Sequence, residues 1–182
     1  MIKHIGTKTI NTKRLTLRKI TVEDTEDFFK MCSKPSVSKY VTWNTHKNIE
    51  ITRAVVENWV NSYNRDRYLW AIEYNGKVIG NIDVVRLTDG NAELGWMLDK
   101  PYWNREIMTE AASAVRDYLF NRVNIDALEC AHVDKNIGSG RVMQKIGMIF
   151  SEYRTFDDES KPKLSGQKLA VYTLTREEWE KI

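Results

Sequence analysis

The stretch NAELGWMLDKPYWNREIMTEAASAVRDYLF, residues 91–120, decides the fold. Residues 91–99 alternate between apolar and polar side chains, which is typical of a strand packed on a core. The apolar face carries Ala92, Leu94, Trp96 and Leu98. Apolar residues then recur every three or four positions and predict a helix over about 106–121. A strand that leads through a loop into a helix start offers unpaired N–H groups and a positive dipole end, which together suit a phosphate group.

The first 64 residues of the sequence predict a strand and two helices. Residues 13–18, KRLTLR, alternate as a half-buried strand does. Thr21 and Asp24 resemble a capping box, which opens a short helix. A second helix is expected over about 48–64, and the segment Pro35–His46 between the two helices is expected to be irregular.

The dipeptide Asn75-Gly76 predicts a hairpin between strands at 68–74 and 77–85. A type I′ turn needs positive φ at both central residues, and Asn-Gly supplies it at low cost. This is the strongest short-range signal in the chain.

The sequence after residue 121 predicts the rest of the sheet. A short strand is expected at 127–133, followed by a brief helix that begins near Asn136 and is closed by Gly147 at the C′ position. Two further strands are expected near 148–157 and 167–174. The alternation of helices and strands predicts one mixed α/β domain over the 182 residues.

Composition limits the function classes. The chain is 42% hydrophobic, and its longest apolar runs are far shorter than the roughly 20 residues that span a bilayer, so we expect a soluble, cytoplasmic protein with no membrane partner. Basic residues exceed acidic ones by only three, with the signs interspersed, which does not indicate a nucleic-acid partner. Cys32 and Cys130 are expected to be small buried side chains, and three scattered histidines give no metal spacing.

Five motifs occur in a specific order. They are AELGWMLD from Ala92, PYW from Pro101, WNREIM from Trp103, TEAA from Thr109 and NIGSGRVMQKIGM from Asn136. Together they resemble the GNAT superfamily of acetyl-CoA-dependent N-acetyltransferases, and the nearest branch is the Rim-type enzymes that acetylate ribosomal-protein N-termini. The resemblance implies a mixed, twisted, mostly antiparallel sheet flanked by helices. It also implies that the central strands at 91–99 and 127–133 splay apart and leave a cleft for the pantetheine arm of acetyl-CoA.

The resemblance assigns the cofactor site. The expected contacts are Met97, Leu98, Trp103, Asn104, Arg105, Glu106, Ile107, Met108, Thr109, Asn136 and Ser139. In the family the phosphate loop reads R/Q-x-x-G-x-G/A, whereas Glu106 and Met108 stand at the two small positions here. A carboxylate close to a pyrophosphate is repulsive, so one interpretation is weaker binding. The other is that Glu106 complements the helix dipole and points outward. Arg105 is a candidate to offset its charge, and the Thr109 hydroxyl is a candidate phosphate donor.

Acetyl transfer to an amine needs a base, because an amine with a pKa near 10.4 is mostly protonated at neutral pH. Glu93 matches a position at which some family members carry a general base, and it lies on the strand face opposite Leu94. The alternative is a structural carboxylate bonded to the backbone or to an arginine. The backbone N–H groups of Met97 and Leu98 are the expected donors to the oxyanion.

The leaving thiolate raises a second question. Many relatives place a tyrosine seven residues after the asparagine of the last motif, and here that position is Met143. Ser139 is therefore the candidate hydrogen-bond donor to the sulfur, with helix capping or solvation as the alternative. Asn136 is expected either to hold the pantetheine amide or to cap its helix. His132 is a candidate proton shuttle, although a packing role is the simpler interpretation.

Gly138 and Gly140 also stand out, because glycine inside a helix costs about 1 kcal/mol. Their presence indicates either a close approach of another group to the backbone or a frayed first turn.

The acceptor pocket is expected to come from Val37–Trp43 and from the loop between the last two strands. That loop carries Asp157, Asp158 and Glu159, which would attract a cationic amine or simply be solvated. The resulting hypothesis is an enzyme that acetylates a primary amine, either a protein N-terminus or a small molecule, by direct attack in a ternary complex. The alternatives are a non-catalytic CoA-binding or protein-interaction module and a related fold that has lost CoA. The oligomeric state, including a homodimer, stays open.

Overall fold

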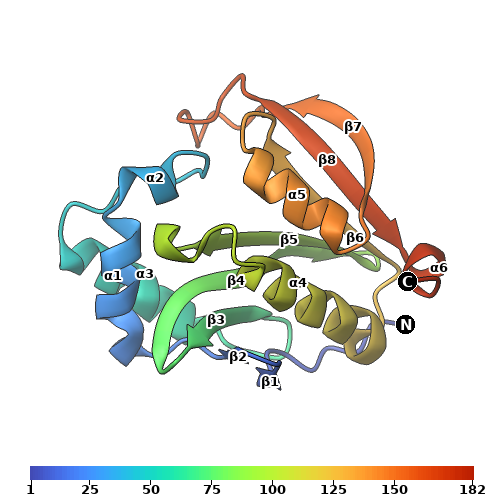
Figure 1. Cartoon of the computed structure of the whole chain (residues 1–182), viewed down its shortest axis with the longest axis horizontal. Helices are drawn as coiled ribbons and strands as arrows, with labels where there is room; N and C mark the ends of the chain where they lie inside the picture. The colour runs from blue at the N-terminus through green and yellow to red at the C-terminus, as the bar shows by residue number, and fades with distance from the viewer.

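The computed structural model describes residues 1–182, which form one eight-stranded sheet with helices on both faces (Figure 1). In chain order the strands are β1 (Ile10–Asn11), β2 (Thr16–Arg18), β3 (Leu69–Tyr74), β4 (Lys77–Thr88), β5 (Asn91–Leu98), β6 (Ala127–Val133), β7 (Ile149–Thr155) and β8 (Lys168–Thr175). The spatial order is β1-β2-β3-β4-β5-β6-β8-β7. Only β5 and β6 pair in parallel. The predicted mixed, mostly antiparallel sheet is confirmed.

Six helices flank this sheet. They are α1 (Thr25–Cys32), α2 (Pro35–Ser38), α3 (Ile49–Asn61), α4 (Ile107–Tyr118), α5 (Ile137–Lys145) and α6 (Arg176–Trp179). Figure 1 shows α4 and α5 in front of the sheet, whereas α1 and α3 stand at its left-hand end. None of the helices has the length and apolar character needed to cross a bilayer.

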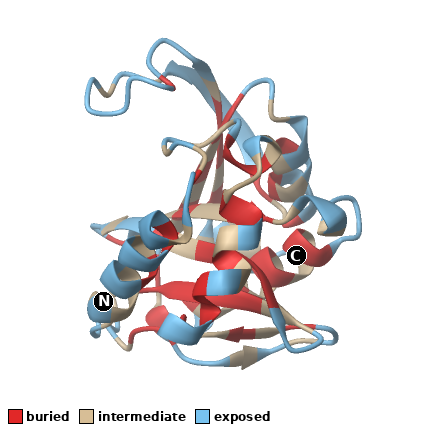
Figure 2. Ribbon diagram, turned by 90° about the vertical axis from the view of Figure 1, so that its left-hand side faces the viewer, coloured by how far each residue is buried: buried red, intermediate tan, exposed pale blue.

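Two hydrophobic clusters fill the two sides of the sheet. The larger contains Leu94 and Leu98 of β5 together with the apolar stripe of α4, and the smaller contains Met97 of β5 together with buried residues of α1 and α3. Figure 2 shows the buried residues concentrated in the strands and in the helix faces against them. The predicted alternation along 91–99 is therefore confirmed, and both cysteines are free and buried.

The central strands separate as predicted. The β5–β6 pairing runs only from Asn91 opposite Ala127 to Leu94 opposite Cys130. Beyond Leu94, β5 stays paired with β4, and β6 stays paired with β8 as far as Val133. The C-terminal half of β5 thus has a free edge that faces the start of α5.

Local turn chemistry explains several boundaries. Asn75 and Gly76 have φ of 50° and 72°, which confirms the type I′ hairpin. Gly147 closes α5 with φ of 87°, as predicted for a C′ glycine.

Three predicted boundaries were wrong. The first predicted strand begins at Thr16 rather than at residue 13, because the residues before it form a tight turn in which the Thr12 hydroxyl contacts the Leu15 backbone. The segment predicted to be irregular contains α2, which begins at Pro35, a residue pre-set for a first helical position. Helix α4 ends at Tyr118 and continues as one π-helical turn, Leu119–Val123.

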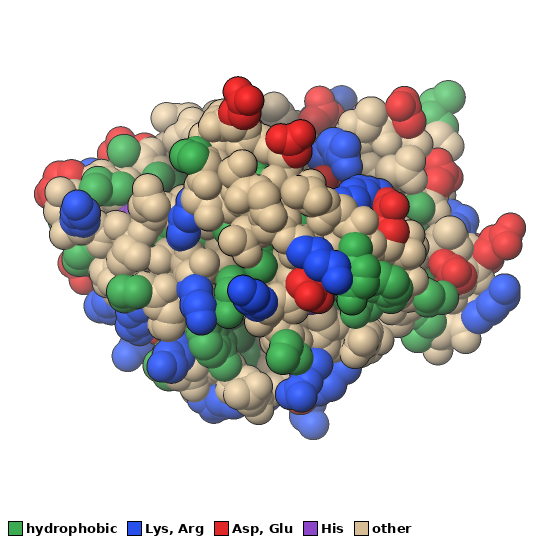
Figure 3. All heavy atoms as spheres, turned by 90° about the horizontal axis from the view of Figure 1, so that it is seen from above, with side chains coloured by type: hydrophobic (Ala, Val, Ile, Leu, Met, Phe, Trp, Pro, Cys, Tyr) green, Lys and Arg blue, Asp and Glu red, His purple; other side chains and the backbone are tan.

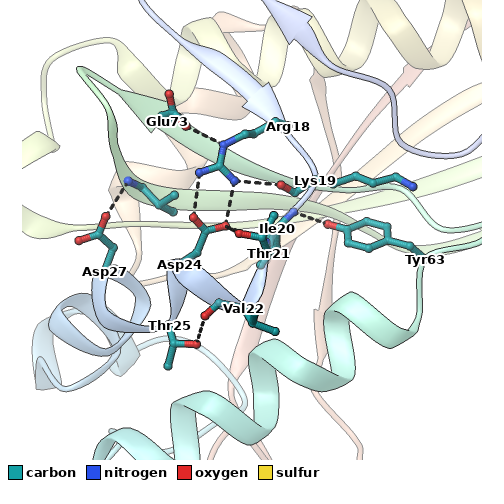
Figure 4. Close-up of polar contacts among 11 residues, drawn as sticks. Arg18, Lys19, Ile20, Thr21, Val22, Asp24, Thr25, Asp27, Tyr63 and Glu73 are labelled. Atoms are coloured by element: carbon teal, nitrogen blue, oxygen red, sulfur yellow. Dashed lines mark hydrogen bonds and ion pairs between the residues drawn. The ribbon is translucent and has the colours of Figure 1, made fainter.

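An arginine fixes the start of α1 (Figure 4). The Arg18 guanidinium donates to both carboxylate oxygens of Asp24, at 2.8 and 2.9 Å, and to Glu73 at 2.6 Å. Asp24 also accepts from the Thr21 N–H at 2.8 Å, as the predicted capping box requires, although the turn that it opens is a 3₁₀ turn ahead of α1. The paired carboxylates raise the pKa of Arg18 above its usual value. This cluster joins β2 and β3 to α1 and so places the segment that follows α1.

Candidate active site

A cavity of about 790 Å³ opens where β5 and β6 separate. One end, called the α4 end below, consists of the loop and first turn Trp103–Thr109 with Lys135–Ser139, Arg141, Val142 and Lys145 of the α5 region. The other end, called the α2 end, consists of Ser36, Val37, Tyr40, Val41 and Met97. Every residue predicted for the cofactor site lines this cavity, together with Val37, Tyr40 and Val41 of the predicted acceptor segment. Glu93, His132 and the loop between β7 and β8 do not line it.

The α4 end is suited to an anion. Helix α4 begins at Ile107, and the first backbone bond into it is Glu110 N–H to Glu106 C=O at 3.0 Å. The N–H groups of Ile107, Met108 and Thr109 therefore have no partner within the helix. Four cations and one carboxylate line the cavity, all at this end. Seen from above, Lys and Arg side chains gather along the lower left, and acidic side chains lie along the upper, left-hand and right-hand edges (Figure 3).

Glu106 occupies the N-cap position of α4 with φ of 58°, and Asn104 has a similar φ of 57°. This left-handed conformation favours glycine, which explains why small residues suit this loop. The Glu106 side chain is 56% exposed and pairs with Lys145 of α5. Lys145, and after it Thr109, hold the pKa of Glu106 below its ordinary value.

The predicted offset of this charge by Arg105 is therefore wrong. The Arg105 guanidinium lies over the rings of Tyr74 and Tyr102, 5.8 and 5.5 Å from their centres, and Lys145 takes its place beside Glu106. Sequence reasoning missed Lys135, Arg141 and Lys145 as lining cations. The four-residue spacing of the last two, which puts both on one helix face, was the available signal.

The free edge of β5 presents one amide in particular. The Asp99 N–H donates to Ile79 C=O of β4 at 2.8 Å. Successive residues of a strand face alternate edges, so the Leu98 N–H points to the side from which β6 has separated. The Leu98 C=O faces the same way and accepts from Trp103 Nε1 at 2.7 Å. The Met97 N–H faces β4 instead, so of the two amides predicted from the sequence only that of Leu98 faces the gap.

Asn136 and Ser139 lie together at the start of α5. The Asn136 Nδ2 donates to Ser139 Oγ at 3.0 Å, and the Ser139 N–H donates to the Asn136 C=O at 3.1 Å. One of the two predictions for Asn136 was that its side chain caps the backbone of its helix. That prediction is wrong, because the side-chain amide donates to the serine instead. An accepted bond leaves the Ser139 hydroxyl hydrogen free for another acceptor. Met143 is buried in the larger core cluster.

His132 packs rather than lining the cavity. Its ring stacks on Tyr172 at 5.8 Å, and its Nδ1 lies 2.8 Å from the Val133 carbonyl. A Cβ added to Gly140 would lie 2.7 Å from the His132 Nε2, so this glycine allows α5 to approach the ring. The close-approach interpretation of Gly140 is confirmed. No group of histidine, cysteine and carboxylate side chains has metal-site geometry.

Glu93 lies outside the cavity lining. Its carboxylate is 3.2 Å from the Arg86 guanidinium, and its side chain is 29% exposed. Arg86 also contacts Glu129, which lies opposite Glu93 on β6 and binds Arg154. The structural alternative considered for Glu93, a carboxylate paired with an arginine, describes this geometry. Its role as a base stays a prediction.

The segment that supplies most of the α2 end is held by a contact from a distant part of the chain. The loop between β7 and β8 brings the Lys163 ammonium to the carbonyls of Ser38 and Trp43, the latter at 2.6 Å. Burial lowers the pKa of Lys163, and Leu164 beside it is buried. This lysine, which no local pattern indicated, joins the two segments predicted to form the acceptor pocket.

Within the acidic run of that loop, Asp158 is tied to its own turn, and Asp157 and Glu159 are exposed. Asp158 accepts from the Ser160 hydroxyl at 2.5 Å and from its N–H at 3.0 Å, and it lies 3.5 Å from Lys161. The Ser160 hydroxyl is the main cause of the lowered pKa of Asp158. This favours the solvated interpretation over an amine-binding one.

The fold and the site define an acyl-transfer enzyme with a cofactor cleft between two splayed strands. A family model described as an acetyltransferase (GNAT) domain matches residues 14–149, and the chain belongs to this family. It is an acetyl-CoA-dependent N-acetyltransferase with acetyl-CoA as co-substrate.

Individual relatives agree with this assignment. The N-acetyltransferase p20 of Bacillus licheniformis is 25% identical over 174 residues, which cover 92% of this chain and 95% of that protein. A GNAT-family acetyltransferase from Bacillus anthracis superposes with a TM-score of 0.81 at 24% identity, covering 93% of this chain and 99% of that one. RimL, a ribosomal alpha-N-protein acetyltransferase solved in complex with coenzyme A, superposes with a TM-score of 0.78 at 14% identity, covering 92% and 98%.

Proposed function

We propose that this enzyme acetylates a primary amine by direct attack within a ternary complex. Acetyl-CoA supplies the acetyl group as a thioester. The ammonium first gives one proton to the base. The amine nitrogen then bonds to the acetyl carbon, the carbon–sulfur bond breaks with its electron pair staying on sulfur, and the nitrogen gives up a second proton to water or to the departing thiolate. The observation that carries the proposal is the two-ended cavity, with unpaired amides and four cations at its α4 end and an uncharged α2 end.

The residues at the α4 end fit a pyrophosphate. The N–H groups of Ile107, Met108 and Thr109 form an anion site at a helix start, and the neighbouring cations complement its charge. Lys145 is shared between this site and Glu106.

Two further groups of the lining are suited to the reacting atoms. The Leu98 N–H, on the free edge of β5, is suited to donate to the carbonyl oxygen of a thioester. The Ser139 hydroxyl, held by Asn136, is suited to donate to the sulfur as negative charge develops on it. A thiol of pKa near 8.5 is a good leaving group, so a tyrosine at the Met143 position is not required.

The proposed base is Glu93, acting through water because its carboxylate does not line the cavity. The same position outside the cavity favours one alternative function, a module that binds CoA without turnover. Turnover separates the two.

A thermal-shift titration with acetyl-CoA, followed by a thiol-release assay, tests the proposal. Ligand at about 100 times its dissociation constant should add about 2.7 kcal/mol of stability. Pantetheine, which lacks the pyrophosphate, is the control ligand and should stabilise far less. The assay panel contrasts peptides that offer an N-terminal amine with small amines. Stabilisation without thiol release from any amine would favour the binding module, and no stabilisation would contradict the use of this cleft for acetyl-CoA.

A further inference from the structure

The α2 end of the cavity carries no acidic or basic side chain. Its lining consists of one serine, one tyrosine, two valines and a methionine, and the only carboxylate anywhere in the lining is Glu106 at the opposite end. That carboxylate is paired with Lys145. An acceptor at the α2 end therefore meets apolar surface and hydroxyl groups.

The carboxylates of β5 and of the residue after it, Glu93 and Asp99, are already paired. Asp99, which follows Met97 by two residues, holds the Lys34 ammonium at 2.6 and 2.8 Å and accepts from the Lys100 N–H at 2.8 Å. Glu93 holds Arg86. None of these oxygens is free to balance a second positive charge on an acceptor.

The loop between β7 and β8 brings a cation to the α2 segment. Lys163, not the acidic run before it, reaches the α2 segment, where its ammonium binds the Ser38 and Trp43 carbonyls. No carboxylate lines the α2 end. A second ammonium on the acceptor would thus lose water without gaining a partner there.

We infer that the acceptor presents a single amine on an uncharged, largely apolar body, and that polycations such as polyamines and aminoglycosides are rejected. This inference rests on the proposed function and names the substrate class of the same site. The reacting nitrogen loses its charge before attack and so can enter, whereas a second ammonium elsewhere on the molecule stays charged.

Hexylamine and 1,6-diaminohexane form a matched pair that tests it, because they differ only by the second amine. With saturating acetyl-CoA at about pH 8, kcat/KM for hexylamine should be about tenfold higher than kcat/KM for 1,6-diaminohexane, a difference of about 1.4 kcal/mol. This preference should appear even though the diamine offers twice as many reacting groups. A kcat/KM for the diamine that equals or exceeds that of hexylamine overturns the inference, as does failure of hexylamine to react on a protein that turns over another amine.

A substitution at the α2 end sharpens the test. Val41→Asp places a carboxylate in the lining and should bring the hexylamine-to-diamine ratio close to one or below it. Val41→Asn has a similar size and no charge, and it should leave the ratio as in the unsubstituted enzyme. If both variants shift the ratio equally, charge is not the determinant and the inference fails. Thermal shift with acetyl-CoA on each variant is independent of the amine, so loss of that shift would contradict the proposed function instead.

Discussion

The two ends of the cavity recognise their ligands by different means. The α4 end is made from the loop and first turn of α4 and from residues in and just before α5, and it offers backbone amides and four cations. The α2 end is made from a four-residue helix and a loop that one ammonium holds together, and no charged side chain lines it. Backbone amides and cations can bind a pyrophosphate whatever the acceptor is. The acceptor itself is recognised by the shape of the uncharged α2 end.

The largest expected effect is on the acetylation rate and concerns Glu93, which lies at neither end of the cavity. Glu93→Gln should lower the rate about a hundredfold at about pH 7 and much less at about pH 9, where more of the amine is already neutral. Glu129→Gln is the matched control, because Glu129 lies opposite Glu93 in the same ion-pair cluster but is not a proposed base. Steady-state rates at both pH values decide the matter. Equal losses in the two variants, independent of pH, would mean that Glu93 only holds the sheet face together.

The same contrast explains what could be predicted from the sequence. The hairpin and the helix start of α4 followed from local patterns, since a turn or a helix start is encoded by adjacent residues. The splay of the strands and the residues of the cofactor site were implied by the resemblance to the GNAT superfamily. Lys163 could not be predicted, because its partners Ser38 and Trp43 are more than a hundred residues away and no local pattern links them. The pairing of Glu106 with Lys145 was missed for the same reason, although the outward-pointing interpretation of Glu106 agrees with its exposure.

The second effect is on the free energy of unfolding and concerns the packing of α5, which supports the α4 end of the cavity. Gly140→Ala should destabilise the protein by about 1–3 kcal/mol, because the new methyl group would meet the buried His132 ring, which Tyr172 and a backbone carbonyl hold in place. Gly138→Ala, two residues earlier, meets nothing closer than 3.8 Å and should be neutral or stabilising by up to about 1 kcal/mol. Urea unfolding measures both. Equal effects would show that α5 tolerates movement against β6.

Ser139 tests whether the start of α5 takes part in chemistry as well as in binding. Ser139→Ala should lower kcat about tenfold with little change in the acetyl-CoA dissociation constant, since a bond to the departing sulfur strengthens only as charge develops. Calorimetry and single-turnover rates separate the two quantities. A loss confined to acetyl-CoA affinity would make Ser139 a binding contact.

A smaller effect is expected at the α2 end. Lys163→Met removes the ammonium that joins the loop to Ser38 and Trp43, and it should raise KM for the amine about three- to fivefold while leaving acetyl-CoA affinity unchanged. Lys161→Met in the same loop removes a charge that contacts only Asp158 in its own turn, so KM should stay constant. Weaker acetyl-CoA binding in the Lys163 variant would mean that the two ends of the cavity are coupled rather than independent.

The smallest effect concerns Glu106, where charge and backbone conformation act on the same loop. Glu106→Gln removes the negative charge and frees Lys145, so acetyl-CoA affinity should rise about threefold at low salt, and the gain should shrink as salt screens it. Glu106→Gly also relieves the left-handed φ, so the melting temperature of this variant should be higher than that of the glutamine variant. Asn104→Gly relieves a similar φ without changing the charge, so it measures the contribution of backbone conformation alone.

The pH dependence of the Glu106–Lys145 pair follows from the lowered pKa of Glu106. A carboxyl group whose pKa is lower in the folded state stabilises that state fully above its ordinary pKa of about 4.3, and the contribution is lost as pH falls through the lowered value. The melting temperatures of the original protein and the glutamine variant should therefore differ by a constant amount near neutral pH and converge in acid. A gap that persists below that range would show that Lys145 does not stabilise the carboxylate. The pair would then be a consequence of the loop's shape rather than one of its supports.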